Sequence, residues 1–159
     1  MKKIVLSCLW ALLLSTVCFS QKSKLPRPSI AAGAEWYVVP GYGANLKLDL
    51  PIADGYAITT AVSYDAMSKE AYLKNYFNIL SGIRFGDPKD MYAYGAIGYS
   101  NAPINYNYYT QIKASGLSVH VGGGYVFNSN IDVATELGLL TYGSDILIFK
   151  IKLAYRIEL

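Results

Sequence analysis

The single histidine of the chain, His120, lies near residue types that could support hydrolysis. Ser118 precedes it on the same face of a predicted strand, and Glu136 follows on the next one. A serine, a histidine and a carboxylate can together activate a nucleophile. The alternative is a hydrogen-bonded protein interior. We favour that alternative because His120 falls in the middle of a strand, where a lipid substrate could not easily reach it.

A second set of residues carries charge at positions that alternate with apolar ones. Acidic and basic members balance, and we expect all of them to face the same interior: Glu35, Lys47, Asp49, Arg84, Asp132, Glu136, Lys150, Lys152, Arg156 and Glu158. A lining of one sign would suit an ion-selective pore. A balanced lining can pair, which buried charges require. We therefore predict a structural charge network in which Lys150 or Lys152 pairs with Glu136 across a hairpin.

Thiol chemistry and metal binding are not expected. Both cysteines, Cys8 and Cys18, lie in the first 20 residues, which we expect to be removed. The run Gly122-Gly123-Gly124 lacks the strand-to-helix context of a phosphate loop and is more typical of curvature or close packing in a barrel wall. Without the two lysines of the leader, the 14 basic residues fall to 12 against 11 acidic ones, which argues against nucleic acid as a partner. We expect no cofactor and no metal.

Strands must position these side chains. Over residues 145–159, large apolar residues occupy every second position, and the intervening positions carry Lys150, Lys152, Arg156 and Glu158. Period two over this length indicates one strand with an apolar and a charged face. Its last apolar positions form a terminal pattern typical of the closing strand of an outer-membrane barrel: Leu153, Tyr155, Ile157 and Leu159.

Eight such segments are predicted, and their connections alternate in length. The segments are 29–39, 42–52, 55–65, 75–85, 90–101, 111–127, 130–141 and 145–159. Tight turns are expected at 53–55, 86–89 and 128–130, and longer, tyrosine-rich loops at 67–74 and 102–110. The segment 90–101 is ambiguous, because Tyr92 and Tyr94 face away from Ile97 and Tyr99, and its glycines could mark a kink or bulge.

The N-terminus reads as an export signal. Lys2 and Lys3 precede a short apolar run, and a cut before Gln21 would follow. The alternatives are a membrane anchor helix, for which the run is short, or a lipoprotein cut before Cys18. We predict a signal peptide at 1–20, a periplasmic lead-in at 21–28 and a single domain at 29–159.

The pattern from 29 to 159 resembles the small eight-stranded outer-membrane proteins of the OmpX/OmpA-type and porin-like barrel families. The resemblance implies an all-β, eight-stranded antiparallel up-and-down transmembrane β-barrel in a bacterial outer membrane. It also implies contact with outer-membrane lipid and with the barrel-assembly machinery during insertion. Residues 96–102 are similar to the His-x-Ser-Asn motif of lipid A deacylase barrels at Ser100 and Asn101. Gly98 stands where the histidine of that motif would be.

Period two does not say which face points outward, and a soluble lipocalin-like barrel is the alternative. Tyr56 and Tyr64 bracket one apolar face, and Phe77 and Phe85 bracket another, each pair eight residues apart. Eight residues at ~3.3 Å, tilted by ~40°, span roughly 20 Å, close to the height of a lipid-facing band. We expect a non-enzymatic structural or surface-contact protein whose two long loops could meet a surface ligand. A narrow porin-like channel is the alternative, and a lipid-directed hydrolase is the least favoured.

Overall fold

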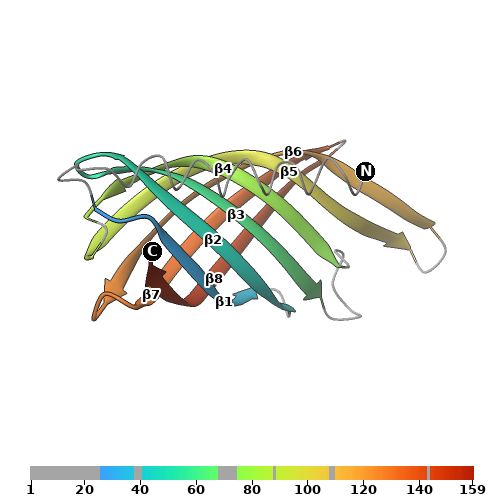
Figure 1. Cartoon of the computed structure of the whole chain (residues 1–159). Helices are drawn as coiled ribbons and strands as arrows, with labels where there is room; N and C mark the ends of the chain where they lie inside the picture. The colour runs from blue at the N-terminus through green and yellow to red at the C-terminus, as the bar shows by residue number, and fades with distance from the viewer. Residues whose placement is uncertain (1–25, 38–40, 68–74, 88, 108–109, 143) are drawn as a thin grey trace, which may run out of the picture.

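The computed structural model describes residues 26–37, 41–67, 75–87, 89–107, 110–142 and 144–159. The predicted signal peptide and most of the lead-in lie outside the described residues. Eight strands account for nearly all of the described chain (Figure 1). They are β1 (Ser29–Tyr37), β2 (Gly41–Ala53), β3 (Tyr56–Met67), β4 (Tyr76–Gly86), β5 (Met91–Asn107), β6 (Thr110–Phe127), β7 (Ile131–Tyr142) and β8 (Ser144–Glu158).

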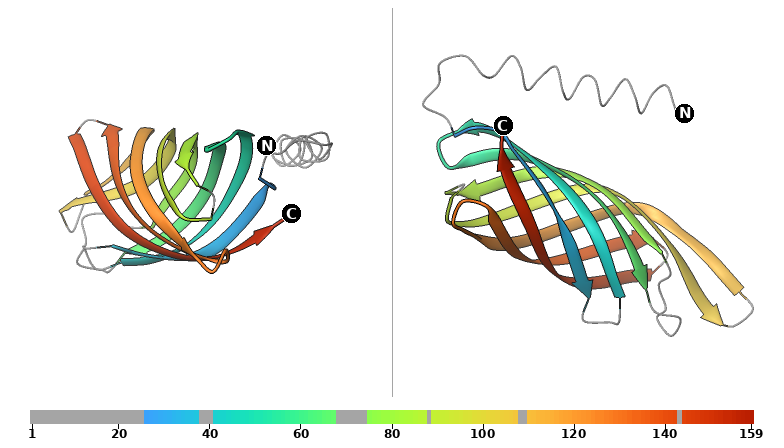
Figure 2. Two further views of the ribbon diagram at one scale, coloured as in Figure 1. Left: turned by 90° about the vertical axis from the view of Figure 1, so that its left-hand side faces the viewer. Right: turned by 60° about the horizontal axis from the view of Figure 1, so that its bottom comes forward.

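The strands close into a barrel. Each pairs antiparallel with the next, and β8 returns to β1 in a ladder that runs from the pair Ser29↔Glu158 to the pair Tyr37↔Lys150. Figure 2 shows β1 and β8 side by side. Closure satisfies the backbone hydrogen bonds of both edges, as a membrane-spanning sheet requires. The predicted fold class, an eight-stranded antiparallel up-and-down transmembrane barrel, is confirmed.

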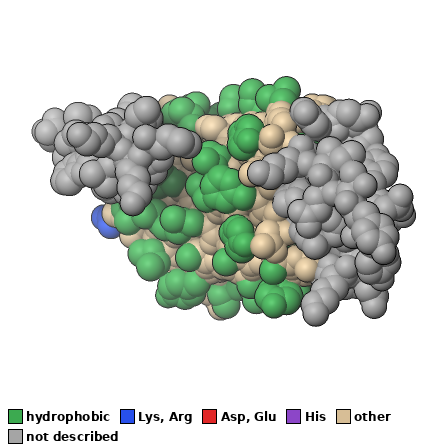
Figure 3. Space-filling view, turned by 90° about the vertical axis from the view of Figure 1, so that its right-hand side faces the viewer, with side chains coloured by type: hydrophobic (Ala, Val, Ile, Leu, Met, Phe, Trp, Pro, Cys, Tyr) green, Lys and Arg blue, Asp and Glu red, His purple; other side chains and the backbone are tan. Residues whose placement is uncertain are grey.

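Apolar side chains cover the outside of the barrel and charged side chains are buried inside it, the reverse of a soluble protein. Ile97, Val121 and Leu147 are 60%, 52% and 67% exposed, whereas Glu35 and Lys150, inside the barrel, are 0% exposed. Figure 3 shows one side of the molecule covered with hydrophobic side chains, with a basic group only at its edge. The soluble-barrel alternative placed the apolar face inside and is therefore wrong.

Aromatic side chains mark two levels on the outer wall. Tyr56 pairs with Phe85 at one level, where the two rings meet edge to face with centroids 6.0 Å apart. Tyr64 pairs with Phe77 at the other level. The aromatic residues predicted from the eight-residue spacing therefore lie at two levels on adjacent strands. The apolar positions of β3 and β4 lie between these levels.

The ambiguous fifth segment is a regular strand. Its register with β4 runs without interruption from Phe77↔Asn101 to Gly86↔Tyr92, so the described residues contain no bulge at its glycines. Tyr92 is 4% exposed and points inward, while Tyr99 is 49% exposed and points outward. The expected kink is therefore wrong, and the alternation looked broken only because tyrosines occur on both faces.

The loop predicted at 102–110 is also wrong. β5 continues to Asn107, and β6 begins at Thr110; the two remain paired from Ala102↔Ala114 to Asn107↔Thr110, with a register shift between Asn105 and Asn107. Polar residues suggested a loop, but the ladder of two long strands continues past the barrel wall as a hairpin (Figure 1). The other predicted loop, 67–74, lies outside the described residues beyond Met67.

Both described chain ends and the turns after β2, β4 and β6 share one end of the barrel. The Leu159 amide donates to the Pro28 carbonyl at 2.8 Å. Positive φ angles close two of the turns, 70° at Gly55 and 49° and 64° at Asn128 and Ser129. We call this the terminal end and the opposite one the hairpin end. Within the described ranges, no helix is long and apolar enough to cross a membrane.

Candidate functional site: the barrel lumen

Buried charges lie inside the barrel in two layers. The proximal layer, nearer the terminal end, consists of Lys47, Asp49, Arg84, Asp132 and Arg156. The distal layer, nearer the hairpin end, consists of Glu35, Asp65, Glu136, Lys150 and Lys152. Period-two alternation places these side chains inside, because each lies on the face opposite the apolar wall.

The proximal layer is held by direct ion pairs. Arg84 Nη1 lies 2.7 Å from Asp49 Oδ2, and both side chains are almost fully buried. Lys47 forms an ion pair with Asp132. Arg156 Nε donates to Ser29 Oγ at 2.8 Å. Buried charges of this kind are tolerated only with close partners, because desolvation costs several kcal/mol per ion.

Tyr92 joins the members of the proximal layer. Its hydroxyl donates to Asp132 Oδ1 at 2.5 Å and accepts from Lys47 Nζ at 3.2 Å. The Arg84 guanidinium carbon lies 3.9 Å from the centroid of the ring, a cation–π contact. One inward tyrosine, which the sequence left ambiguous, therefore contacts three of the charged residues.

The distal layer is a denser network. Lys150 Nζ lies 3.0 Å from Glu35 Oε2, 3.5 Å from Asp65 Oδ2 and 3.7 Å from Glu136 Oε1. Lys152 Nζ lies 2.7 Å from Glu136 Oε2 and 3.2 Å from Glu35 Oε1. Both predicted partners of Glu136 therefore contact it. The buried acids of this layer each have a cation within 4 Å.

Apolar packing covers the distal layer at the hairpin end. Tyr76, Leu140 and Ile148 form a buried cluster against which Tyr37 and Met67 pack. The Lys150 ammonium lies 5.1 Å from the Tyr76 ring centroid and 5.3 Å from that of Tyr37. The ammonium group therefore makes cation–π contacts with two rings while it also reaches its carboxylates.

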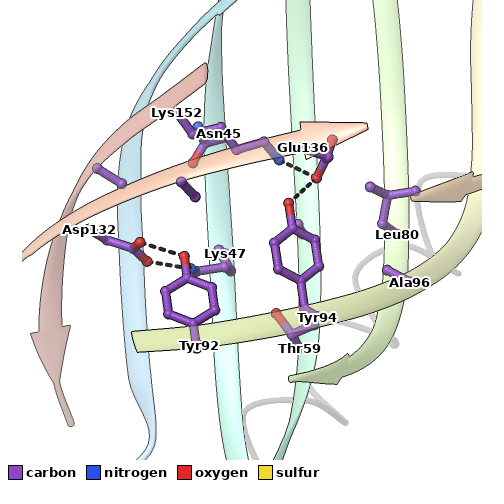
Figure 4. A pocket seen from close by; sticks show the side chains of 13 residues that line it. Asn45, Lys47, Thr59, Leu80, Tyr92, Tyr94, Ala96, Asp132, Glu136 and Lys152 are labelled. Carbon is purple, nitrogen blue, oxygen red and sulfur yellow. Dashed lines mark hydrogen bonds and ion pairs between the residues drawn. The ribbon is translucent and has the colours of Figure 1, made fainter. Parts of the chain in front are cut away.

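A small cavity separates the two layers. Its volume is about 30 Å³, and its lining takes side chains from both layers. In Figure 4, Lys47 and Asp132 meet Tyr92 on one side, while Lys152 and Glu136 meet Tyr94 on the other. Its remaining lining includes Asn45, Thr59, Leu80 and Ala96. This volume admits a water molecule or two, but no larger solute.

Glycines in the wall make room for the inward rings. A Cβ at Gly122 would lie 2.7 Å from the Tyr94 ring, and one at Gly124 would lie 2.7 Å from the Tyr92 hydroxyl. A Cβ at Gly138 would lie 2.7 Å from His120 Cε1. The glycine run 122–124 therefore permits close packing, as expected from the sequence.

The candidate hydrolytic residues are arranged as parts of a filled interior. His120 Nδ1 lies 2.9 Å from Glu136 Oε1, but Ser118 Oγ lies 2.6 Å from Ser100 Oγ. Among the described contacts, no hydrogen bond joins Ser118 to His120, and both side chains are 0% exposed. Ser100 continues the chain of hydrogen bonds to Asn78 Oδ1 at 2.5 Å. A nucleophile needs contact with its base, which this arrangement does not supply.

The two residues that match the deacylase motif lie on opposite faces of β5. Ser100 points into the lumen and is 0% exposed, whereas Asn101 is exposed on the other face. The two residues therefore do not lie in one site. Within the described residues, no group of three or more histidine, cysteine or acidic side chains is placed to hold a metal ion.

Glu158 departs from its predicted position. It lies at the rim of the terminal end, with its side chain 33% exposed, and pairs with Lys89 at 3.7 Å. Asp65 was missed, although it continues the inward alternation of Ser63 by one step. The apolar residues of the predicted terminal pattern face outward, with exposures of 44%, 59%, 55% and 54% at Leu153, Tyr155, Ile157 and Leu159.

Comparisons with known proteins define the class of fold. No protein-family model and no curated protein sequence matches the chain. The structure is similar to that of Ail, the attachment invasion locus protein of Yersinia pestis, with a TM-score of 0.61 and 13% identity over 83% of this chain and 99% of Ail. The N-terminal β-barrel domain of Pseudomonas aeruginosa OprF gives a TM-score of 0.60 and 16% identity over 84% of this chain and 100% of the domain.

A third similar structure is Neisserial surface protein A, with a TM-score of 0.50 and 12% identity over 86% of this chain and 98% of that one. At these identities the likeness concerns the fold. This fold is that of the small eight-stranded outer-membrane β-barrels.

Proposed function

We propose that the chain is an integral protein of a bacterial outer membrane, with a structural or surface-contact role and a lumen filled by paired charges. The observation that carries this proposal is the inside-out distribution of side chains, with apolar residues exposed outside and ion pairs buried inside. Lipid is the solvent that makes such an outer wall favourable. We expect the protein to be non-enzymatic.

Orientation follows from the ends of the barrel. The described chain ends share one end with the turns after β2, β4 and β6, and the long β5–β6 hairpin extends from the other. In barrels of this kind, short turns are periplasmic and longer connections are extracellular. We infer that the signal peptide 1–20 directs export and that 21–28 lies in the periplasm. We further infer that the terminal residues of β8 are recognised during insertion by the assembly machinery.

Fractionation and gel mobility test the membrane assignment. The protein should sediment with outer membranes, require detergent for extraction, and migrate faster unheated than boiled. A closed barrel resists detergent denaturation until it is heated, whereas the unfolded chain binds more detergent and migrates more slowly. Recovery of a folded, detergent-free protein from the periplasm would contradict the proposal.

The β5–β6 hairpin supports the surface-contact role. β5 pairs with β4 only as far as Asn101, and β6 pairs with β7 only from Ser118, so both strands extend past their described neighbours. Such a ribbon presents backbone edges that partners can pair with. Ail has also been solved in complex with the heparin analogue sucrose octasulfate, which makes this compound a defined first probe.

A shortened hairpin tests that role. Replacing 102–114 by an Asn-Gly turn removes the ribbon and keeps the register of the β5–β6 ladder in the barrel wall, because Asn101 pairs with Ser115. If the ribbon is the contact surface, binding to sucrose octasulfate should fall while heat-modifiable mobility persists. Unchanged binding would place the contact elsewhere.

A narrow channel is the second candidate, and the central cavity favours it. The Lys47 and Lys152 side chains retain 18% and 14% exposure although both lie inside the wall. Liposome swelling with small sugars separates the candidates. A filled lumen predicts the rate of protein-free liposomes, whereas rapid swelling would support the channel.

A further inference from the structure

The cavity at the centre of the lumen contains more hydrogen-bonding capacity than its protein neighbours use. Asn45 Nδ2 is buried and has no protein hydrogen-bond partner among the described residues. The Lys47 ammonium donates to Tyr92 and Asp132, although an ammonium has three N–H donors. Both side chains line the cavity. A buried polar group without a partner costs free energy that one bound water can recover.

The size and lining of the cavity suit water. A site needs roughly 10–15 Å³ of such volume and two to four polar partners to hold one water molecule. The volume here is about 30 Å³, and carboxylates, ammonium groups, an amide and tyrosine hydroxyls contribute polar atoms. A dry cavity is typical of a wholly apolar lining, whereas here these polar groups stand beside Leu80 and four alanines.

The two layers lie at different heights on either side of this cavity. Asp132 and Glu136 are four residues apart on β7, with Ala134 between them on the same face. Four residues at ~3.4 Å, tilted by ~40°, give roughly 10 Å of height. Each layer also crosses the lumen, since Lys47 on β2 reaches Asp132 on β7, and Lys150 on β8 reaches Asp65 on β3.

The layers also differ in formal charge. Among the lysine, arginine, aspartate and glutamate side chains, the proximal layer has three bases against two acids, and the distal layer has three acids against two bases. A cation that passes the distal layer meets a net positive layer next, and an anion meets the opposite order. Two layers of opposite sign in series therefore oppose both kinds of ion.

We propose that the lumen is a hydrated compartment closed by two independent seals in series, the proximal and the distal layer. This inference rests on the proposed membrane barrel with a filled lumen. Removing one seal should give access to the compartment from one end only, and ions should cross only when both seals are removed.

Matched variants test the arrangement. The proximal variant combines Asp49→Ala, Arg84→Ala and Tyr92→Ala; the distal variant combines Glu35→Ala, Lys150→Ala and Tyr76→Ala. Each removes one acid, one base and one tyrosine, so the net charge is unchanged. Ala134→Cys in each background provides a reporter thiol in the cavity wall, because the cysteines of the chain lie only at positions 8 and 18.

The readouts are thiol modification by a small methanethiosulfonate reagent in nanodiscs and conductance in planar bilayers. We expect the reporter thiol to be protected in the intact lumen and reactive in either variant, with steady conductance only when the two variants are combined. Asp54→Cys, in an exposed turn, is the positive control for the reagent. Conductance through one variant alone equal to that of the combination would show a single seal and overturn the proposal, as would protection of the reporter thiol in both variants.

A milder change keeps the proposal testable if these variants do not fold. Ala134→Val adds methyl groups to the cavity. If the cavity is hydrated, the substitution displaces water from polar groups and lowers the unfolding midpoint. A higher midpoint would indicate a dry void and overturn the hydrated compartment. Steady conductance of the unmodified barrel would instead contradict the filled lumen of the proposed function.

Discussion

Lys150 Nζ lies 3.0 Å from Glu35 Oε2 although 115 residues separate the two in the sequence. Glu35 is on the first strand and Lys150 on the last, so this contact exists only when β8 pairs with β1. The ion pair therefore depends on closure of the barrel. The same lysine also approaches Asp65 and Glu136, which connects the closing strands to β3 and β7.

The Asp49–Arg84 pair should show strong coupling. Arg84→Met keeps much of the side-chain packing but leaves the Asp49 carboxylate buried without its closest cation, and we expect a loss of about 3–5 kcal/mol of unfolding free energy. Asp49→Leu should cost a similar amount, and the double variant less than the sum of the two. Urea unfolding in detergent micelles measures all three. A coupling energy near zero would mean that the contact between Asp49 and Arg84 does not stabilise the folded barrel.

Charge on the outer wall should be costly in proportion to its depth. Val62→Lys and Ile151→Lys place an ammonium in the apolar band and should each cost about 2–4 kcal/mol. Ala61→Ser adds one hydroxyl group on the inward face of the same strand, beside the cavity, and should be milder. Reversible unfolding into denaturant from phospholipid vesicles gives the comparison. An inverted order would mean that the faces are assigned the wrong way round.

Glycines beside inward rings should not tolerate a side chain. Gly124→Val would bring methyl groups against the Tyr92 hydroxyl, and overpacking of this kind typically costs about 1–3 kcal/mol. Gly95→Val is the matched control, because a Cβ there meets no atom within 4 Å. The control should be neutral or slightly stabilising, as expected for a strand glycine with free space. Equal losses at both positions would point to a backbone effect rather than a clash.

The Tyr92 hydroxyl should matter more than an outward one. Tyr92→Phe removes a donor to Asp132 and an acceptor for Lys47, and we expect a loss of about 1–3 kcal/mol. Tyr99→Phe, on the lipid side, should change stability by less than about 0.5 kcal/mol. The unfolding midpoints of the two variants test this difference. Similar midpoints would indicate that the Tyr92 hydroxyl is already hydrated.

Strand number, order and the inward charges could be predicted because period-two alternation is local. One face of β7 carries Asp132, Ala134 and Glu136, and the alternating positions between and beside them are apolar except for Thr135. Contacts such as Lys150–Glu35 could not be predicted, because the stagger of strands around a barrel depends on all eight at once. Candidate partners on adjacent strands, such as Lys152 for Glu136, depend on only one hairpin, so the sequence alone could suggest them.

Tyrosine was the main source of error. The residue suits a membrane surface, a buried hydrogen bond and an extended hairpin alike. Tyr92 and Tyr94 therefore obscured the alternation of β5, and the tyrosines near Asn107 suggested a loop where the ladder continues. In both places pairing with a neighbouring strand decided the outcome, and a single segment carries no information about that pairing.

Single-channel recording of the unmodified protein in planar bilayers tests the central claim most directly. The paired charges of both layers and the small volume between them predict no steady single-channel current, with at most brief openings. Insertion of the protein is verified beforehand by the heat-dependent gel shift. A large and steady conductance would contradict the filled lumen and favour a channel for small solutes.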